Sequence, residues 1–204
     1  MNIITVSREF GCGGREIGKR LADLLAIYYY DREILTAIAE KTALNEEYIE
    51  STLNAGIMRS FPVTFGRTFA YHTGSTNTAA LLAQQHRIIK EIASKGRDFV
   101  IVGRSADVIL ADQKPFNLFV YADMEDRICR CKERSSKKSV TDSDLKKEIK
   151  RIDHSRRECH AIVSGTEWGE KSGYHLCVNT TGAEIKELTP LIAAFAKNYF
   201  GRME

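Results

Sequence analysis

The sequence has little proline and tryptophan, with three prolines and one tryptophan among 204 residues, and it has no long hydrophobic run. Together with 14 glycines and 28% charged residues, this composition excludes a collagen-like, low-complexity or disordered chain. The longest stretch without Asp, Glu, Lys or Arg is Thr68 to His86, and its many Thr, Ser, Asn and Gln residues exclude a membrane span. A signal peptide is also missing at the N-terminus, so we expect a cytoplasmic protein with one compact domain over residues 1–204.

The chain has few cysteines, and their positions do not suggest disulfides or a metal. The five cysteines are an odd number and are scattered, so reduced thiols are expected. Cys129 and Cys131 would point to different faces of a helix, and no second pair at ligand spacing follows, so no metal-ligating residues are predicted. The net charge of +3 is compatible with an anionic ligand but too small to indicate a nucleic-acid partner.

Short apolar segments alternate with amphipathic ones along the chain. The segments that predict strands are residues 2–6, 26–30, 99–102, 116–121 and 174–178. The first predicted helix begins at Gly14 or Arg15. The further predicted helices cover residues 33–41, 44–55, 78–94, 124–134 with Asp123 as its cap, 145–162 and 183–199. Asp31 is expected to cap the helix that follows it. Five strands separated by helices predict an α/β fold with a parallel sheet covered on both faces.

Two segments interrupt this pattern. Residues 56–77 contain a proline, three glycines and aromatic residues without a clean period, which predicts either a substrate flap or a loop packed by its own aromatics. Arginines gather on both sides of a Ser- and Lys-rich stretch at residues 135–139, which fits either a basic lid over residues 127–157 or a solvated helical hairpin.

The predicted site lies where the strands end. Ligands of parallel α/β sheets bind outside the carboxyl ends of the strands, and three of these ends carry Ser7 to Glu16, Asp31 and Gly103-Arg104. A glycine-rich turn that leads into a helix presents backbone N–H groups and the positive end of the helix dipole to a phosphate. The glycines could also serve only to make a tight turn. With the other strand-end residues, they favour a nucleotide or another phosphorylated ligand.

The register of the glycine loop follows from the helix behind it. A literal Walker pattern would run from Gly13 to Lys19, but Ile17 already belongs to the apolar face of the helix, so the loop is Arg8 to Gly14. In that register Gly14 occupies the usual lysine position and Glu16 replaces the hydroxyl that would hold magnesium. Arg15 or Arg8 could supply the missing positive charge.

Four segments together carry a family resemblance: SREFGCGGREIGKRLA from Ser7, YD from Tyr30, VIVGRSAD from Val100, and residues 168–180. They resemble the cytidylate kinase-like family, a divergent branch of the P-loop nucleoside monophosphate kinases, and the resemblance covers essentially the whole chain. It implies a P-loop NTPase-like three-layer α/β fold with a five-stranded parallel sheet and a helical lid. It also implies ATP and Mg²⁺ as cofactors and small-molecule nucleotide substrates, without nucleic-acid or membrane partners.

The resemblance assigns roles to particular residues. For the donor phosphates it implies Ser7, Arg8 and the loop Gly11, Cys12, Gly13, Gly14, Arg15 and Glu16. For the acceptor it implies Asp31, Arg104 and Asp153, and for the lid Arg127, Arg130, Arg134 and Arg151. The expected catalytic residues are Arg15, Arg104, Arg156 and Arg157. The Ser or Thr and the arginine that hold cytidine monophosphate in true cytidylate kinases do not recur, since Arg32 and Ala37 stand there.

Three functions remain open on this sequence. The first is ATP-dependent phosphoryl transfer to a nucleoside monophosphate, with CMP or dCMP first by resemblance. The second is a nucleotide-binding module without transfer activity, suggested by Gly14 and Glu16 in place of lysine and threonine. The third is a kinase for another small acceptor, suggested by the missing CMP contacts.

Overall fold

The computed structural model describes residues 1–55, 74–134 and 140–202, with the side chains of residues 51–55 and 74–78 outside this description. Its five strands form one parallel sheet in the order β2-β3-β1-β4-β5. The strands are β1 (Ile3–Arg8), β2 (Tyr28–Tyr30), β3 (Phe99–Val102), β4 (Phe116–Tyr121) and β5 (Leu176–Asn179). This sheet confirms the predicted α/β fold.

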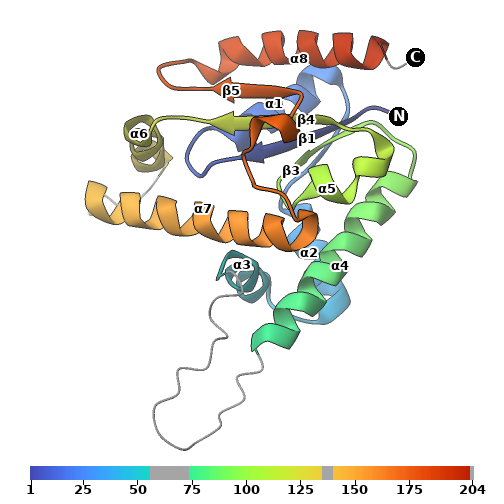
Figure 1. Ribbon diagram of the computed structural model, residues 1–204, viewed down its shortest axis with the longest axis vertical. Coiled ribbons are helices and arrows are strands. Elements are labelled where there is room, and N and C mark those ends of the chain that lie inside the picture. Colours follow the sequence, from blue (N-terminus) through green and yellow to red (C-terminus); the bar gives the residue numbers. More distant parts are fainter. Residues whose placement is uncertain (56–73, 135–139, 203–204) are drawn as a thin grey trace, which may run out of the picture.

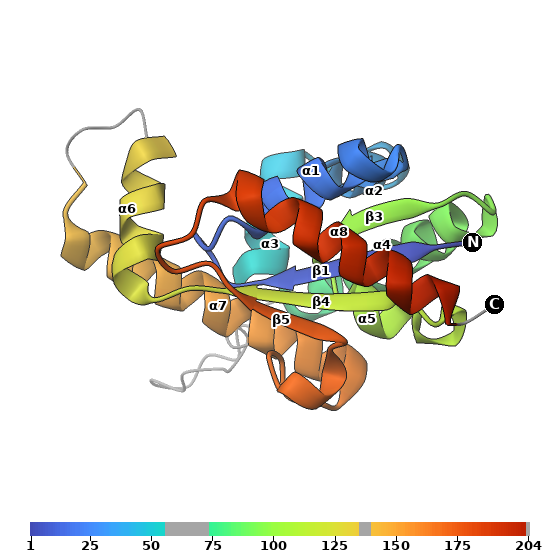
Figure 2. The same ribbon diagram turned by 90° about the horizontal axis from the view of Figure 1, so that it is seen from above.

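Helices cover both faces of the sheet and complete the three layers (Figure 1). On one face lie α1 (Gly14–Leu25) and α8 (Ile185–Gly201), side by side in Figure 2. On the other face lie α2 (Glu33–Thr42), α3 (Glu46–Ala55), α4 (Gly74–Ser94), α5 (Ala106–Ile109) and α7 (Asp142–Ser164). Helix α6 (Met124–Arg134) follows β4 at the edge where the strands end.

Alternating side chains of the strands fill two separate cores. Ile3, Phe99 and Ile101 pack with α2, α4 and α5 on one face of the sheet. Ile4 and Val102, on the other face, pack with α1 and α8. Because successive side chains of a strand point to opposite faces, the short apolar runs of the sequence supply both cores at once.

Several boundaries differ from the sequence predictions. Strand β2 begins at Tyr28 rather than Ala26, because Ala26 adopts φ 54° and ends α1. Helix α4 begins at Gly74, so residues 74–77 of the predicted flap are helical, and the rest of that flap lies outside the described residues. Helix α5 and two 3-10 turns, at residues 111–113 and 171–173, were not predicted.

The predicted helix cap at Asp31 is wrong. Arg32 is the N-cap residue of α2, and no side chain caps this helix. The Asp31 carboxylate instead forms an ion pair with Arg15, 2.5 Å between Nε and Oδ2. Among the described residues, no helix is both long enough and apolar enough to cross a bilayer.

Candidate active site

The glycine loop between β1 and α1 has the shape of a phosphate cradle. Gly11 and Gly13 adopt positive φ angles of 83° and 86°, and α1 begins at Gly14, which confirms the register predicted from Ile17. A Cβ atom on Gly14 would lie 2.6 Å from the Cβ atom of Arg8, so no side chain fits at the usual lysine position. The loop therefore offers backbone N–H groups and the helix dipole to a ligand, with the side chain of Arg8 beside them.

The far side of the loop is fixed to the sheet. The buried Cys12 thiol donates a hydrogen bond to the Val120 carbonyl at 3.2 Å, and burial raises the pKa of this thiol to about 11. The Cys12 carbonyl accepts a hydrogen bond from the hydroxyl of Thr180 at 2.8 Å, and Arg130 in turn donates to the Thr180 carbonyl at 2.7 Å. Cys12 thus serves as a neutral anchor of the loop, and Arg130 ties α6 to the segment after β5.

Arg127 and Asp153 hold the start of the loop from the opposite side. Both side chains are almost fully buried and form an ion pair with each other. Arg127 also donates to the Phe10 carbonyl at 2.7 Å and to Glu9 Oε2 at 3.0 Å, while Asp153 Oδ1 accepts the Phe10 N–H at 2.8 Å. In this arrangement the two residues connect α6 and α7 to the loop backbone.

A polar cavity of about 280 Å³ opens next to the loop at the carboxyl ends of the strands. Its wall combines the end of β1, the turn after β3 and one side of α7. Six arginines line it, namely Arg8, Arg15, Arg32, Arg104, Arg151 and Arg156, against two glutamates, Glu50 and Glu148. Such an excess of guanidinium groups favours an anionic ligand.

Three of these guanidinium groups, those of Arg8, Arg104 and Arg156, are partly buried close together, and Arg156 is paired with Asp153 at 3.5 Å. Burial, with a smaller contribution from the neighbouring Arg8, lowers the pKa of Arg104 to about 10, against the attraction of Asp31. Burial also lowers the pKa of Arg156 to about 9, again with a contribution from Arg8, and lowers that of Arg8 itself. The Nε atom of Arg104 is buried and has no hydrogen-bond partner among the described residues. An anion in the cavity would satisfy this donor and stabilise all three charges.

The backbone of the β3–α5 turn is shaped around these side chains. A Cβ atom on Gly103 would lie 1.5 Å from Nη1 of Arg8, so only glycine lets the Arg8 guanidinium lie against this turn. Arg104 and Ser105 both have positive φ angles, 64° and 52°. The side-chain amide of Gln85 donates to the Arg104 carbonyl at 3.1 Å, which helps to hold this unfavourable backbone.

A second cavity of about 420 Å³ lies on the other side of the loop, between α1, α6 and the segment before α8. Glu16 lines it and is paired with Arg20 and Arg134, each at 2.9 Å. Arg130 lines the same cavity. Both oxygens of Glu16 are thus held by arginines, and the Arg134 pair joins the end of α6 to the first turn of α1.

Other predicted site residues have local partners. Arg151 makes two hydrogen bonds to Glu148, one turn before it on α7, at the rim of the first cavity. Arg157 lies over the Trp168 ring, with 5.5 Å between the guanidinium carbon and the ring centre. Ser7 lines the cavity and is hydrogen-bonded to the Tyr174 hydroxyl, whose pKa burial raises to about 12.

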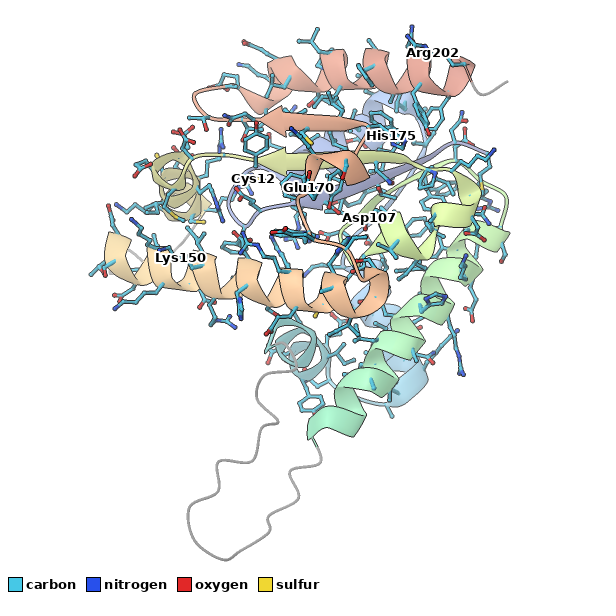
Figure 3. All side chains as sticks on the ribbon, viewed as in Figure 1. Cys12, Asp107, Lys150, Glu170, His175 and Arg202 are labelled. Carbon is cyan, nitrogen blue, oxygen red and sulfur yellow. The ribbon has the colours of Figure 1, made fainter. Side chains whose placement is uncertain are left out.

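Sequence reasoning missed several residues of the cavity wall. Gln85, Arg32 and Glu50 line it, as does His160, which is buried and paired with Asp107 at 3.3 Å. Asp107 lies in the VGRSAD segment, and that was the only available signal for the pair. Figure 3 shows Asp107 between the sheet and the C-terminal end of α7, and Cys12 toward the opposite end of the sheet.

Comparison with solved structures identifies the class of fold. A shikimate kinase from Bacteroides thetaiotaomicron matches with a TM-score of 0.58 and 12% identity, covering 96% of this chain and 98% of that one. A gluconokinase from Sinorhizobium meliloti 1021 matches with a TM-score of 0.53 and 14% identity, covering 100% and 98%. The chain therefore has the fold of the P-loop kinases of small molecules.

The family is defined more narrowly by sequence. The sequence model of the cytidylate kinase-like family matches residues 3–182, and this chain belongs to that family. An uncharacterised protein from Eubacterium ventriosum ATCC 27560 has the same fold, with a TM-score of 0.70, 23% identity and coverage of 97% of this chain and 99% of that one. A search of curated proteins gave no significant match.

Proposed function

We propose that this protein is an ATP- and Mg²⁺-dependent kinase that transfers the γ-phosphoryl group to a nucleoside monophosphate, with CMP and dCMP as the first acceptors to test. One observation carries the proposal. Arg8, Arg104 and Arg156 bring three partly buried guanidinium groups to one cavity beside a phosphate cradle, where burial and mutual repulsion lower their pKa values. An acceptor with its own phosphate matches this charge better than a neutral acceptor would.

The two cavities suggest separate places for the two substrates. The cavity of the three arginines would hold the acceptor phosphate, with Arg104 as its main ligand. The loop amides and Arg15 would hold the donor phosphates, and the second cavity, at the other side of the loop, would take the rest of the donor nucleotide. Arg130 and Arg134 line that second cavity and are placed to neutralise the donor.

In the proposed reaction no side chain of the protein forms a covalent bond to a substrate. An oxygen of the acceptor phosphate forms a bond to the γ-phosphorus while the bond from that phosphorus to the β–γ bridging oxygen breaks, and ADP leaves with the bond electrons. The attacking oxygen is already anionic, so no general base is needed. The contribution of the chain is therefore positive charge and alignment, supplied by Arg15, Arg104 and Arg156.

The residues present offer one fitting ligand for the magnesium ion that accompanies ATP. Oδ1 of Asp31 is buried without a hydrogen-bond partner among the described residues, and a carboxylate oxygen suits this cation. Glu16, which replaces the usual hydroxyl, does not fit, because both its oxygens are held by arginines. When bound, the ion would neutralise the donor phosphates, and Asp31 would orient it.

A specific observation also favours the second function, a nucleotide-binding module without transfer activity. The loop has no room for a lysine side chain at Gly14, where active P-loop enzymes carry one. In the proposed kinase Arg8 and Arg15 supply the positive charge that the lysine supplies in active P-loop enzymes. In the binding module no residue supplies it. The third function, a kinase for another small acceptor, is favoured by Arg32 and Glu50 in the cavity wall, where the cytidine contacts of true cytidylate kinases do not recur.

The test measures ADP release from Mg-ATP by the purified full chain with each nucleoside monophosphate in turn. We expect turnover with one acceptor or one pair of acceptors, and loss of that turnover in Arg104→Ala. The matched control is Arg97→Ala, because Arg97 is an exposed arginine two residues before β3 and does not line the cavity. ATP binding without turnover on any acceptor would favour the binding module, whereas turnover only with non-nucleotide acceptors would favour the third function.

The lid over residues 127–157 and the flap over residues 56–77 stay predictions. In the arrangement that the structure describes, Arg127, Asp153 and Arg156 already contact the loop. Residues 135–139, between the two arms of the predicted lid, lie outside the described residues. We propose that Arg156, and not Arg157, acts on the transferring group, because Arg157 lies over the Trp168 ring instead of lining the cavity.

A further inference from the structure

A buried pair of polar side chains, Asp107 and His160, lies beside the acceptor cavity and is not used by the proposed reaction. Both residues are less than one-tenth exposed, and Nε2 of His160 lies 3.3 Å from Oδ2 of Asp107. The other ring nitrogen, Nδ1, lies 3.0 Å from the Ser164 hydroxyl. Nδ1 also lies 3.4 Å from the Thr166 carbonyl, and the Ser164 hydroxyl donates to the His160 carbonyl at 2.9 Å, so the ring is held from both sides.

Both ring nitrogens are therefore occupied within the protein. Neither has a lone pair or proton directed at a ligand, although His160 lines the cavity. This arrangement excludes the simple interpretation of the pair as a general base for the acceptor. The pair has to act, if it acts in catalysis, through the residues that it holds.

The positions of Asp107 and His160 along the chain show that the residues they hold in place are Arg104 and Arg156. Asp107 lies in the first turn of α5, three residues after Arg104, and His160 lies on α7, one helical turn after Arg156. Arg104 and Arg156 thus come from two elements about 50 residues apart in sequence, and both must reach one phosphate. The Asp107–His160 bond joins the two elements next to these arginines.

The turn that carries Arg104 needs such support. Two successive residues that are not glycine, Arg104 and Ser105, have positive φ angles, which residues other than glycine rarely adopt because they strain the backbone. No side chain caps α5, which is only four residues long. Gln85 holds the turn from α4, and the Asp107–His160 bond holds it from α7.

Stabilisation of the fold does not by itself explain why Asp107 and His160 are buried against each other. A buried polar pair is often no more stable than apolar side chains of the same size, and Oδ1 of Asp107 is buried without any hydrogen-bond partner among the described residues. We propose that Asp107 and His160 are positioning residues, which set the separation between Arg104 and Arg156 and thereby the affinity for the acceptor phosphate. This inference rests on the proposed function only for the identity of the acceptor. Arg104 and Arg156 line the cavity whichever acceptor binds there.

The test uses two readouts on the full chain. The first is the stabilisation of the protein by inorganic phosphate in thermal unfolding, which needs no turnover, and the second is the KM for the acceptor against the KM for ATP. The variants are Asp107→Leu, His160→Leu and their combination, with Asp107→Asn as the conservative variant that can still accept the Nε2 hydrogen bond. His154→Leu is the matched control, because His154 is an exposed histidine on the same helix, paired with Glu158.

We expect Asp107→Leu and His160→Leu each to weaken phosphate binding and to raise the acceptor KM by about tenfold to a hundredfold, with the KM for ATP unchanged. The double variant should be no worse than either single variant, because both remove the same bond. Asp107→Asn and His154→Leu should behave like the wild type. This pattern separates positioning from a general loss of structure, which would affect both substrates.

The inference is overturned if phosphate binding is unchanged in the leucine variants, or if the losses in acceptor and ATP affinity are equal and follow the melting temperature. It is also overturned if the wild type does not bind phosphate at all. Failure of the proposed kinase activity gives a different result, namely no turnover with any acceptor while phosphate still stabilises the wild type and not the leucine variants.

Discussion

Replacing Arg104 with methionine should make the ligand-free protein more stable. Burial and the neighbouring Arg8 lower the pKa of Arg104 from 12.5 to about 10, so the folded state disfavours the charge by about 2.5 pKa units. At about 1.4 kcal/mol per unit, this penalty is on the order of 3 kcal/mol. A methionine side chain is apolar and of similar length, so it removes the penalty while it keeps most of the packing.

The sign of the effect follows from the direction of the shift. The pKa of Arg104 is lower in the folded than in the unfolded chain, so the penalty is fully present at every pH below about 10 and fades as the pH rises through that value toward 12.5. At neutral pH we therefore expect a gain of about 1–3 kcal/mol in the free energy of unfolding. For a chain of this length, each kcal/mol corresponds to about 2–4 °C in melting temperature.

The assay is thermal unfolding at pH 7 with and without inorganic phosphate. Phosphate should raise the melting temperature of the wild type, because it binds only the folded state, and it should have little effect on Arg104→Met. The reasoning is refuted if the ligand-free variant melts below the wild type, or if phosphate stabilises both proteins equally. Either result would mean that Arg104 is balanced by charges other than a bound anion.

Three further predictions follow from particular contacts. Gly14→Ala should displace Arg8, since the new Cβ atom would meet its side chain at 2.6 Å, and should weaken phosphate binding measured by calorimetry, whereas Gly173→Ala, with open space around it, should not. Arg127→Met should lower the free energy of unfolding in urea by about 3–5 kcal/mol, because it removes the ion pair of the buried Asp153 and leaves that carboxylate only the longer contact with Arg156 at 3.5 Å as a charged partner; a loss below 1 kcal/mol would contradict this reasoning. Phosphate affinity at the cavity should fall as the pH rises through about 9, where Arg156 loses its proton, and a flat titration curve up to pH 10 would be inconsistent with that pKa.

Local patterns in the sequence predicted the fold because the fold repeats one simple unit. Each strand is a short apolar run, and the spacing of Ile17 and Leu21 predicted a start of α1 at Gly14 or Arg15, where Gly14 is the observed one. The strand-end residues Asp31 and Arg104 lie near each other because the carboxyl ends of parallel strands meet at one edge of a sheet.

The roles within α6 and α7 could not be predicted in the same way. Both helices are rich in charged residues, so in the sequence Arg127 and Asp153 cannot be told apart from the charged residues of a solvent-exposed helix face. Their burial depends on how the two helices lie against the loop, which is a contact between segments more than 100 residues apart. The Asp107–His160 bond joins residues 53 apart and likewise leaves no local signal.

The central claim is that Arg8, Arg104 and Arg156 bind the phosphate of an acceptor to which the γ-phosphoryl group is transferred. The most direct measurement follows a radiolabelled γ-phosphate from ATP onto a panel of nucleoside monophosphates, with wild type, Arg104→Ala and Arg97→Ala side by side. We predict label in the diphosphate of one acceptor for wild type and Arg97→Ala, and none for Arg104→Ala. Equal labelling by all three proteins, or none by the wild type with any acceptor, would contradict the account.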